Sequence, residues 1–239
     1  MNPHSITPLE SKYEVTAREV SDIFSDYNFT KTRVEIEIAY YKLICQLNLK
    51  QPSQDMINFA FDYKAYKYIK IIEKTTKHDV KAIEYFLKNL IVDDTKEYVH
   101  FGLTSQDINS LAYSMMINKY TDKFTSKCTE LRGELATLAN KSKVLFCART
   151  HGQAAVPTSF DKEFDIFFEN LGQIHENIFD NTLTCKFGGA NGDLLAHKFA
   201  DHHDWHNEMD IFIKEISKWY EIKRTKTTTQ VDNNIELAN

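Results

Sequence analysis

The chain has 239 residues, of which 42% are hydrophobic and 26% charged, and its formal net charge is −5. That length and composition are typical of an ordinary globular protein with one large domain or two small ones. The negative charge argues against nucleic acid as a main partner, although a few cations in a cleft would still bind a small anion.

Membrane insertion and secretion are not expected from this sequence. No apolar run approaches the ~20 residues that a membrane-spanning helix needs. The first ten residues lack the basic and apolar regions of a secretion signal. The four cysteines are scattered without a CxxC pair, so we expect small buried thiols rather than disulfides or a zinc site. A reducing, cytoplasmic location follows from these expectations.

The N-terminal part of the chain predicts a small helical domain. Only seven glycines and four prolines occur in the whole sequence, which favours long helices over many turns. Helices are predicted over residues 31–49, 55–73 and 79–91. Polar residues near 91–98 indicate a soft boundary, and we therefore assign residues 1–94 to this domain.

The remaining residues, 95–239, predict a bundle of long helices. Apolar residues recur there at steps of three and four, as on the buried face of a helix. The predicted helices cover residues 105–141, 160–178 and 205–219. We interpret the aromatic stripes of the last two as packing rather than as a cofactor site. Because no β-alternation stands out, the expected fold class is all-α.

A histidine in a short polar turn is the most informative local feature. The segment Arg149-Thr150-His151-Gly152-Gln153 lies between two of the predicted long helices. A glycine lets the backbone approach a ligand closely, and side chains such as Thr150 and Gln153 bind carboxylate, phosphate or amide groups. The segment indicates an acid or base in a polar cradle, with an exposed spacer turn as the alternative.

Two further polar clusters each begin an amphipathic helix. The first, residues 75–82, contains His78 and Asp79, where Asp79 would either orient an imidazole or cap the helix. In the second, residues 101–109, Thr104 and Ser105 lie at a helix N-terminus. Free backbone N–H groups and the helix dipole favour an anion there, which is compatible with a plain N-cap.

These segments together resemble the adenylosuccinate lyases, within the fumarase and argininosuccinate lyase superfamily. Thr104-Ser105-Gln106-Asp107-Ile108 resembles an element shared across that superfamily. Thr150-His151-Gly152-Gln153, combined with Thr76-Lys77-His78-Asp79-Val80, is similar to the adenylosuccinate branch. The resemblance extends from about Pro8 to about Gln230, and it implies a helical N-terminal domain followed by a long-helix bundle.

The resemblance implies a C–N lyase of purine nucleotide biosynthesis that releases fumarate. Its substrates would be adenylosuccinate, giving AMP, and SAICAR, giving AICAR. Such a β-elimination needs a base, an acid for the departing nitrogen, and donors that stabilise negative charge on the carboxylate. The resemblance makes His151 the general acid, with His78 as its catalytic partner. On the sequence alone, His78 would be an ordinary residue at a helix N-terminus.

Substrate-binding residues follow from the same resemblance. Thr104 and Ser105 would hold a succinyl carboxylate, and Asp79, Thr150 and Gln153 would complete the polar site. Gln230 matches a glutamine that contacts substrate in the family. Lys12-Tyr13 aligns with an Arg-Tyr pair that holds the nucleotide, and lysine replaces a bidentate phosphate fork with a point charge.

The resemblance implies no cofactor and no metal. The cluster Asp201-His202-His203-Asp204-Trp205-His206 offers only His202 and His206 at a ligand-like spacing, so we interpret it as a solvated helix entry. Family members are homotetramers whose active sites combine several subunits. A homo-oligomer that binds a small molecule, but neither nucleic acid nor membrane, is therefore expected.

The family's catalytic serine, on a mobile Gly-Ser-rich loop before a Met-Pro-x-Lys element, has no counterpart in these 239 residues. We expect a fragment of a longer enzyme, incomplete at the C-terminal end of the bundle. The alternative function is that of a truncated, non-catalytic homologue that only binds ligand or associates with lyase subunits. A sister lyase acting on argininosuccinate or fumarate is a third possibility, against which residues 76–82 argue.

Overall fold

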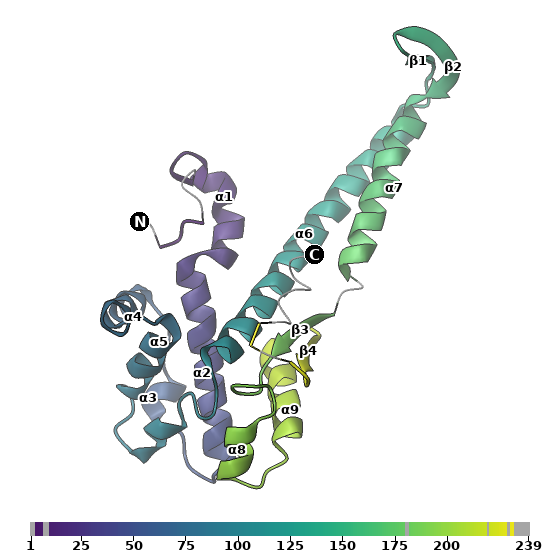
Figure 1. Cartoon of the computed structure of the whole chain (residues 1–239). Helices are drawn as coiled ribbons and strands as arrows, with labels where there is room; N and C mark the ends of the chain where they lie inside the picture. Colours follow the sequence, from purple (N-terminus) through teal and green to yellow (C-terminus); the bar gives the residue numbers. More distant parts are fainter. Residues whose placement is uncertain (1–2, 7–9, 180–181, 219, 229, 232–239) are drawn as a thin grey trace. The chain divides into compact units, whose positions relative to one another are not determined.

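The computed structural model describes residues 3–6, 10–179, 182–218, 220–228 and 230–231, and its elements are labelled in Figure 1. The chain divides into two compact units. The first unit contains residues 1–118 and 183–239, and the second contains residues 119–182. The expected domain division at residues 94 and 95 stays a prediction.

Helices form most of the first unit. Its N-terminal elements are α1 (Glu10–Phe24), α2 (Asp26–Leu47), α3 (Gln54–Ile57), α4 (Tyr63–Thr76), α5 (Asp79–Lys88) and the 3₁₀ helix η1 (Asp94–Tyr98). The single helix predicted over residues 55–73 is wrong, because the chain breaks between α3 and α4. Asp62 accepts the Ala65 N–H at 2.8 Å and thereby caps α4, which starts a new helix there.

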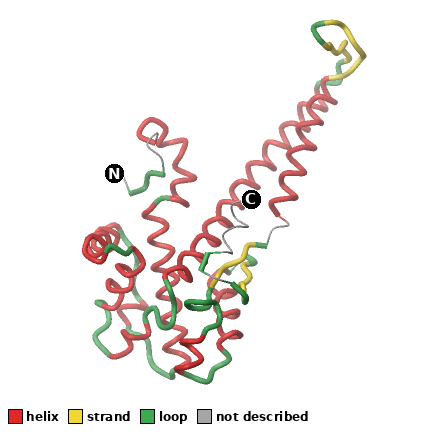
Figure 2. The backbone as a smooth tube through the Cα atoms, viewed as in Figure 1, coloured by secondary structure: helices red, strands yellow, loops and turns green. Residues whose placement is uncertain are grey.

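The C-terminal part of the first unit adds two helices and a parallel strand pair. The helices are α8 (Leu195–Ala200) and α9 (Trp205–Ser217), and the strands are β3 (Leu183–Lys186) and β4 (Ile222–Thr225). Figure 2 shows the strands as short yellow segments among the red helices. Leu183 pairs with Ile222 and Lys186 with Thr225. The expectation of no strands was wrong here, although the fold remains predominantly helical.

The core of the first unit lies between α2, α9 and the start of the long helix α6 (Ser105–Lys141). The predicted stripe on α9 is confirmed as packing, since Trp205, Met209 and Phe212 are buried. Trp219, at the end of that predicted stripe, lies outside the described residues. A second apolar cluster joins α2 to α4 and α5. These two clusters fix the helix ends that hold the polar segments.

The second unit contains the rest of α6, the strands β1 (Leu145–Thr150) and β2 (Gln153–Ser159), and α7 (Phe160–Phe179). The two strands form an antiparallel hairpin, so the simple turn expected between helices was wrong. His151 and Gly152 form its tip with positive φ angles of 51° and 77°. Two successive positive φ angles are typical of a tight hairpin turn. Cys147, expected to be buried, is exposed on β1.

Much of the apolar stripe on α7 faces outward within this chain. Phe160, Phe167 and Ile174 are 45%, 60% and 47% exposed. Their interpretation as packing therefore does not hold within a single chain. Arg132 of α6 covers the ring of Phe168 at 4.3 Å, which shows that α6 and α7 contact each other inside the second unit. Among the described residues, no helix is both long and apolar enough to cross a membrane.

Position 102, just before α6, requires a glycine because of its backbone conformation and because of its close packing against His197. Its φ is +67°, a conformation that side chains disfavour, and a Cβ added there would lie 2.6 Å from the His197 ring. His197 is fully buried, so its ring has little freedom to move away. The close approach of Gly102 to His197 joins the loop before α6 to α8.

We predict that Gly102→Ala lowers the free energy of unfolding by about 2–4 kcal/mol, because it adds left-handed strain to overpacking. Gly133→Ala is the matched control, since Gly133 lies within α6 and nothing lies within 4 Å of an added Cβ. That control should be neutral or stabilise by up to ~1 kcal/mol. Urea unfolding of both variants measures the difference, and equal stabilities would contradict the account of Gly102.

Candidate active site

Asp107 is the centre of a buried polar cluster at the start of α6. Its Oδ2 accepts the backbone N–H of Thr104 at 2.6 Å and the Thr104 hydroxyl at 2.8 Å. Its Oδ1 accepts the N–H groups of Gly188 and Gly189 at 2.6 Å and 3.1 Å. Asp107 thus closes the first turn of α6 in the manner of a capping box and anchors the Gly-rich turn after β3.

Lys186, the last residue of β3, supplies the positive charge of this cluster. Its side chain is fully buried, and Nζ lies 2.9 Å from Asp107 Oδ1. Nζ also donates to Thr104 Oγ1 at 2.9 Å and to Gln230 Oε1 at 3.3 Å. A buried ammonium is tolerated only when a counter-charge and further acceptors surround it, and all of these are present.

Gln230 joins the cluster from a segment distant in sequence. Its Nε2 donates to the carbonyl of Ala190 in the Gly-rich turn. The structure therefore brings together Thr104 and Gln230, two of the predicted binding residues. We call Thr104, Asp107, Lys186 and Gln230 the lysine cluster. Ser105, another predicted binding residue, is half-buried as the first residue of α6, directly beside it.

His78 and Asp79 are connected to α6 through a buried arginine. His78 is itself the N-cap of α5, where Nδ1 accepts the Lys81 N–H at 3.2 Å, and its side chain is half-exposed. Asp79 pairs with Arg33 of α2, whose Nη1 also donates to Asn109 Oδ1 at 3.3 Å. Asn109 lies two residues beyond Asp107 on α6. These bonds join the two polar segments within the first unit.

The charge of Arg33 also decides the ionisation of Asp79. Partial burial raises the pKa of Asp79, but the charge and hydrogen bond of the Arg33 guanidinium outweigh it. The net pKa therefore lies below its usual range. Asp79 therefore stays ionised near neutral pH, and its Oδ1 lies 3.6 Å from His78 Nδ1.

Two buried histidines next to this network were missed by the sequence interpretation. His100 Nδ1 lies 2.5 Å from Glu37 Oε1, and Glu37 is fully buried. Burial lowers the pKa of His100, but the Glu37 carboxylate outweighs it, so the pKa is raised. One signal for a buried charge was available in the sequence. Arg33 and Glu37 share a face of the predicted helix with the apolar residues Tyr40 and Ile44, so a buried Glu37 would need a partner such as His100.

His197 has the opposite character. Its Nε2 lies 2.7 Å from the Tyr40 hydroxyl, which also donates to the Phe101 carbonyl at 2.7 Å. Burial lowers the pKa of His197 to about 4, so the ring is neutral near pH 7. His197 therefore serves packing and orientation beside Gly102, and it is not a proton donor at neutral pH.

The histidine of the polar turn lies in the other unit. His151 is exposed at the tip of the β1–β2 hairpin, with Thr150 Oγ1 3.0 Å from its Nδ1. Gln153 is exposed at the start of β2. Thr150, His151 and Gln153 thus form one exposed polar group in the second unit. All other predicted site residues belong to the first unit.

Lys12 and Tyr13 lie on α1 of the first unit. Lys12 Nζ is 5.4 Å from the centre of the Tyr13 ring, and Tyr13 is 51% exposed. The backbone of Tyr13 departs from helical geometry, with φ −118° and ψ 23°, which kinks α1 at this pair. The pair is therefore presented at a bend, where both side chains are accessible.

Potential metal-ligating side chains lie scattered in the parts of the chain that the structure describes. No group of three or more histidine, cysteine, aspartate or glutamate side chains is arranged there to hold an ion. In the sequence cluster 201–206, His203 pairs with Asp201 at 3.0 Å. His206 contacts Lys198 and Arg224. Its contacts with two cations are opposite to those of a metal ligand.

Residues 11–238 match the family model described as lyase. The chain belongs to this lyase family. It is 34% identical to the adenylosuccinate lyase of Dictyostelium discoideum over 260 residues, covering 99% of this chain and 55% of that protein. It is 31% identical to the adenylosuccinate lyase of Buchnera aphidicola, covering 98% of this chain and 54% of that protein. The chain thus spans about half the length of the curated relatives it matches.

Solved structures of two other enzymes share the fold. A fumarate lyase from Mesorhizobium aligns with a TM-score of 0.74 at 18% identity, covering 92% of this chain and 51% of that one. A 3-carboxy-cis,cis-muconate lactonizing enzyme from Pseudomonas putida aligns with a TM-score of 0.73 at 20% identity, over the same shares. The all-α fold of the fumarase/aspartase type, expected from the sequence, is confirmed.

We predict strong coupling between Lys186 and Asp107 in a double-mutant cycle. Lys186→Met and Asp107→Asn should each lower the free energy of unfolding by about 3–5 kcal/mol, because each leaves a buried partner uncompensated. The double variant should lose less than the sum of the two, by at least ~1 kcal/mol. Urea unfolding of the four proteins provides the measurement.

The control for this cycle is an exposed ion pair. Lys127 and Glu130 are 3.0 Å apart, with side chains 66% and 61% exposed. Lys127→Met should cost less than ~1 kcal/mol. Losses as small as this at Lys186, or strict additivity in the cycle, would show that the buried pair does not organise the cluster.

Proposed function

We propose that this lyase-family chain acts on adenylosuccinate, and on SAICAR, releasing fumarate by cleavage of a C–N bond in purine nucleotide biosynthesis. The products would be AMP and AICAR. The main observation behind this proposal is that two polar segments which resemble adenylosuccinate lyases, residues 76–80 and 104–108, are brought near each other. Arg33 pairs with Asp79 and also donates to Asn109, the residue that follows the second segment. The similarity to adenylosuccinate lyases over 99% and 98% of this chain supports it.

The residues fit distinct tasks in such an elimination. The start of α6 would bind a succinyl carboxylate, because the N–H group at Ser105 and the helix dipole favour an anion. Lys186 beneath Thr104 adds positive charge to this end of the helix, balanced in part by Asp107. Negative charge that develops on the carboxylate during proton abstraction would be stabilised there.

Proton transfer is assigned to the two accessible histidines. His151 would protonate the departing nitrogen as general acid, since imidazole changes charge near neutral pH. His78, held in place as an N-cap beside ionised Asp79, would be its partner or would bind substrate. The family's serine base has no counterpart in these 239 residues, so we assign this chain substrate binding and the acid half of the reaction.

The nucleotide phosphate is assigned to Lys12 at the bend in α1. A lysine attracts phosphate as a point charge, without the bidentate geometry of an arginine, so the binding is expected to be weaker than with the family's Arg. Gln230 would contact the substrate from the lysine cluster. We further propose a cytoplasmic homotetramer in which several subunits contribute to each site.

We predict that His78→Ala and Gln230→Ala each weaken adenylosuccinate binding about tenfold, which corresponds to ~1.4 kcal/mol of lost polar interaction. Isothermal titration calorimetry measures the affinity. Lys127→Ala, an exposed lysine of the second unit, is the control and should bind like the unchanged chain. Unchanged affinity in both test variants would refute the assignment of this site.

Turnover needs a separate assay. Absorbance loss on adding adenylosuccinate, with AMP and fumarate confirmed as products, reports the reaction. If the chain turns over, His151→Ala should lower the rate by at least ~100-fold while leaving substrate affinity nearly unchanged. Full activity in that variant would refute the role of His151 as general acid.

The exposed apolar face of α7 favours a second candidate function, a non-catalytic chain that associates with lyase subunits. Three large apolar side chains on one face are costly to leave in water and are typical of a contact surface. They are Phe160, Phe167 and Ile174. This candidate shares self-association with the first but lacks turnover, so the assay above separates the two.

We predict that Phe167→Asp shifts the chain to a smaller species in analytical ultracentrifugation, because it places a charge in the contact surface. Val92→Asp is the control, since Val92 is 95% exposed and lies in the first unit, away from α7 in sequence. A wild-type chain that sediments as a folded monomer would contradict self-association through α7.

A further inference from the structure

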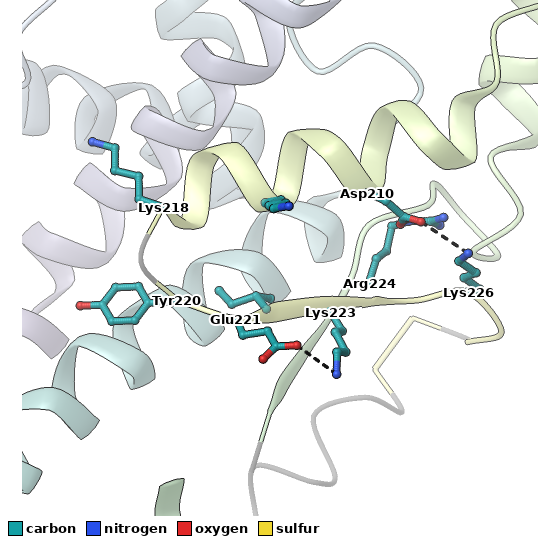
Figure 3. A pocket seen from close by; sticks show the side chains of 9 residues that line it. Asp210, Lys218, Tyr220, Glu221, Lys223, Arg224 and Lys226 are labelled. Atoms are coloured by element: carbon teal, nitrogen blue, oxygen red, sulfur yellow. Dashed lines mark hydrogen bonds and ion pairs between the residues drawn. The ribbon is translucent and has the colours of Figure 1, made fainter. Parts of the chain in front are cut away.

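A groove between α9 and β4 lies outside the candidate active site. It has a volume of about 660 Å³, within the usual range of small-molecule sites. Figure 3 shows Arg224 and Asp210 between α9 and β4, Glu221 and Lys223 on the other side of β4, and Lys218 and Tyr220 on the connection between the two elements. The lining residues are Asp210, Lys214, Lys218, Tyr220, Glu221, Ile222, Lys223, Arg224 and Lys226.

The groove is positive, although the chain as a whole is negative. Its lining contains four lysines and one arginine but only two carboxylates, Asp210 and Glu221. These carboxylates are already paired, Asp210 with Arg224 and Lys226, and Glu221 with Lys223. The formal balance of +3 contrasts with −5 for the whole chain. A concave surface of one sign attracts small ions of the other sign.

Arg224 forms the floor of this groove. It is only 8% exposed, and Figure 3 shows it rising from β4 towards Asp210 on α9. Its Nε donates to Asp210 Oδ1 at 2.7 Å, whereas its buried Nη1 has no hydrogen-bond partner among the described residues. An unpaired guanidinium donor in the interior is costly, and an anionic acceptor would satisfy it.

A second excess of donors adjoins Arg224. His206 Nδ1 lies 3.0 Å from Arg224 Nη2, and His206 Nε2 lies 3.0 Å from Lys198 Nζ. Lysine and arginine only donate, whereas a neutral imidazole accepts at one nitrogen alone. Arg224 Nη2 also donates to the His206 carbonyl at 3.4 Å, but one of the two cations that contact the ring, Lys198 or Arg224, still faces a nitrogen that cannot accept. This arrangement again favours an anion with several oxygens nearby.

We propose that the groove between α9 and β4 binds a small anion carrying two or more phosphate groups. Lysines bind phosphate as mobile point charges, and an arginine adds directed donors. A chain of two or three phosphates matches the spread of positive side chains along α9 and β4 better than a single carboxylate. Tyr220 supplies a partly exposed ring for a nucleoside.

This inference is independent of the proposed lyase function. None of the groove residues belongs to the lysine cluster, to the His78 segment or to the hairpin of His151. A phosphate compound bound here would act as an effector or as a stabilising ligand rather than as the substrate.

The test uses the full chain and inorganic pyrophosphate in isothermal titration calorimetry at low salt, about 50 mM. Lys223→Ala combined with Lys226→Ala should weaken binding about tenfold, because two of the five cations are lost. The matched control is Lys127→Ala with Lys162→Ala, two exposed lysines of the second unit that each pair with one glutamate. That control should change affinity less than about twofold.

Parallel titration with ATP identifies the source of the phosphates. Equal affinity for ATP and pyrophosphate shows that the phosphate chain alone is bound, and tighter binding of ATP shows that the groove also contacts the nucleoside, for which Tyr220 is the nearest aromatic ring. Either result supports the proposal. No pyrophosphate binding by the unchanged chain, or equal weakening in the control variant, would overturn it. Adenylosuccinate affinity should stay unchanged in the Lys223/Lys226 variant, which separates this groove from the candidate active site.

Discussion

The buried pair of Lys186 and Asp107 is the interaction on which the candidate site depends. A carboxylate and an ammonium removed from water stabilise a fold only when every remaining donor and acceptor is satisfied. Here Asp107 accepts from Thr104, Gly188 and Gly189, while Lys186 also donates to Gln230. The start of α6, the Gly-rich turn and Gln230 are therefore fixed together, although they are far apart in sequence.

The histidines of the chain differ in burial and in their charged neighbours. Burial keeps His197 neutral beside Gly102, whereas the buried Glu37 carboxylate raises the pKa of His100. His78 and His151 are accessible, as the roles proposed for them require. The positive groove on α9 and β4 forms a separate electrostatic feature, built from different residues. The two proposed anion sites thus lie in the first unit and use different residues.

The sequence predicted the long helices well, since apolar periodicity determines them: α6 was expected over residues 105–141 and spans Ser105–Lys141. Thr104 was proposed as a binding residue from its helix N-terminus and the family resemblance, and Gln230 from the resemblance alone; the structure brings the two together. The break between α3 and α4 was missed because Asp62 interrupts the apolar pattern without a glycine or proline to mark it. The strands β3 and β4 were missed because they have only four residues each. The burial of Lys186 and Arg33 could not be predicted from the sequence. Their partners Thr104 and Asp79 lie 82 and 46 positions away, and a charged residue carries no local signal of such distant contacts.

Hydrogen–deuterium exchange with and without adenylosuccinate tests the central claim most directly, that the segments joined through Arg33 and the lysine cluster form one substrate site. The account predicts added protection in residues 76–81, 104–109 and 186–192 together, with the α9–β4 groove unchanged. Protection confined to residues 210–226, or no protection in the three segments, would contradict it.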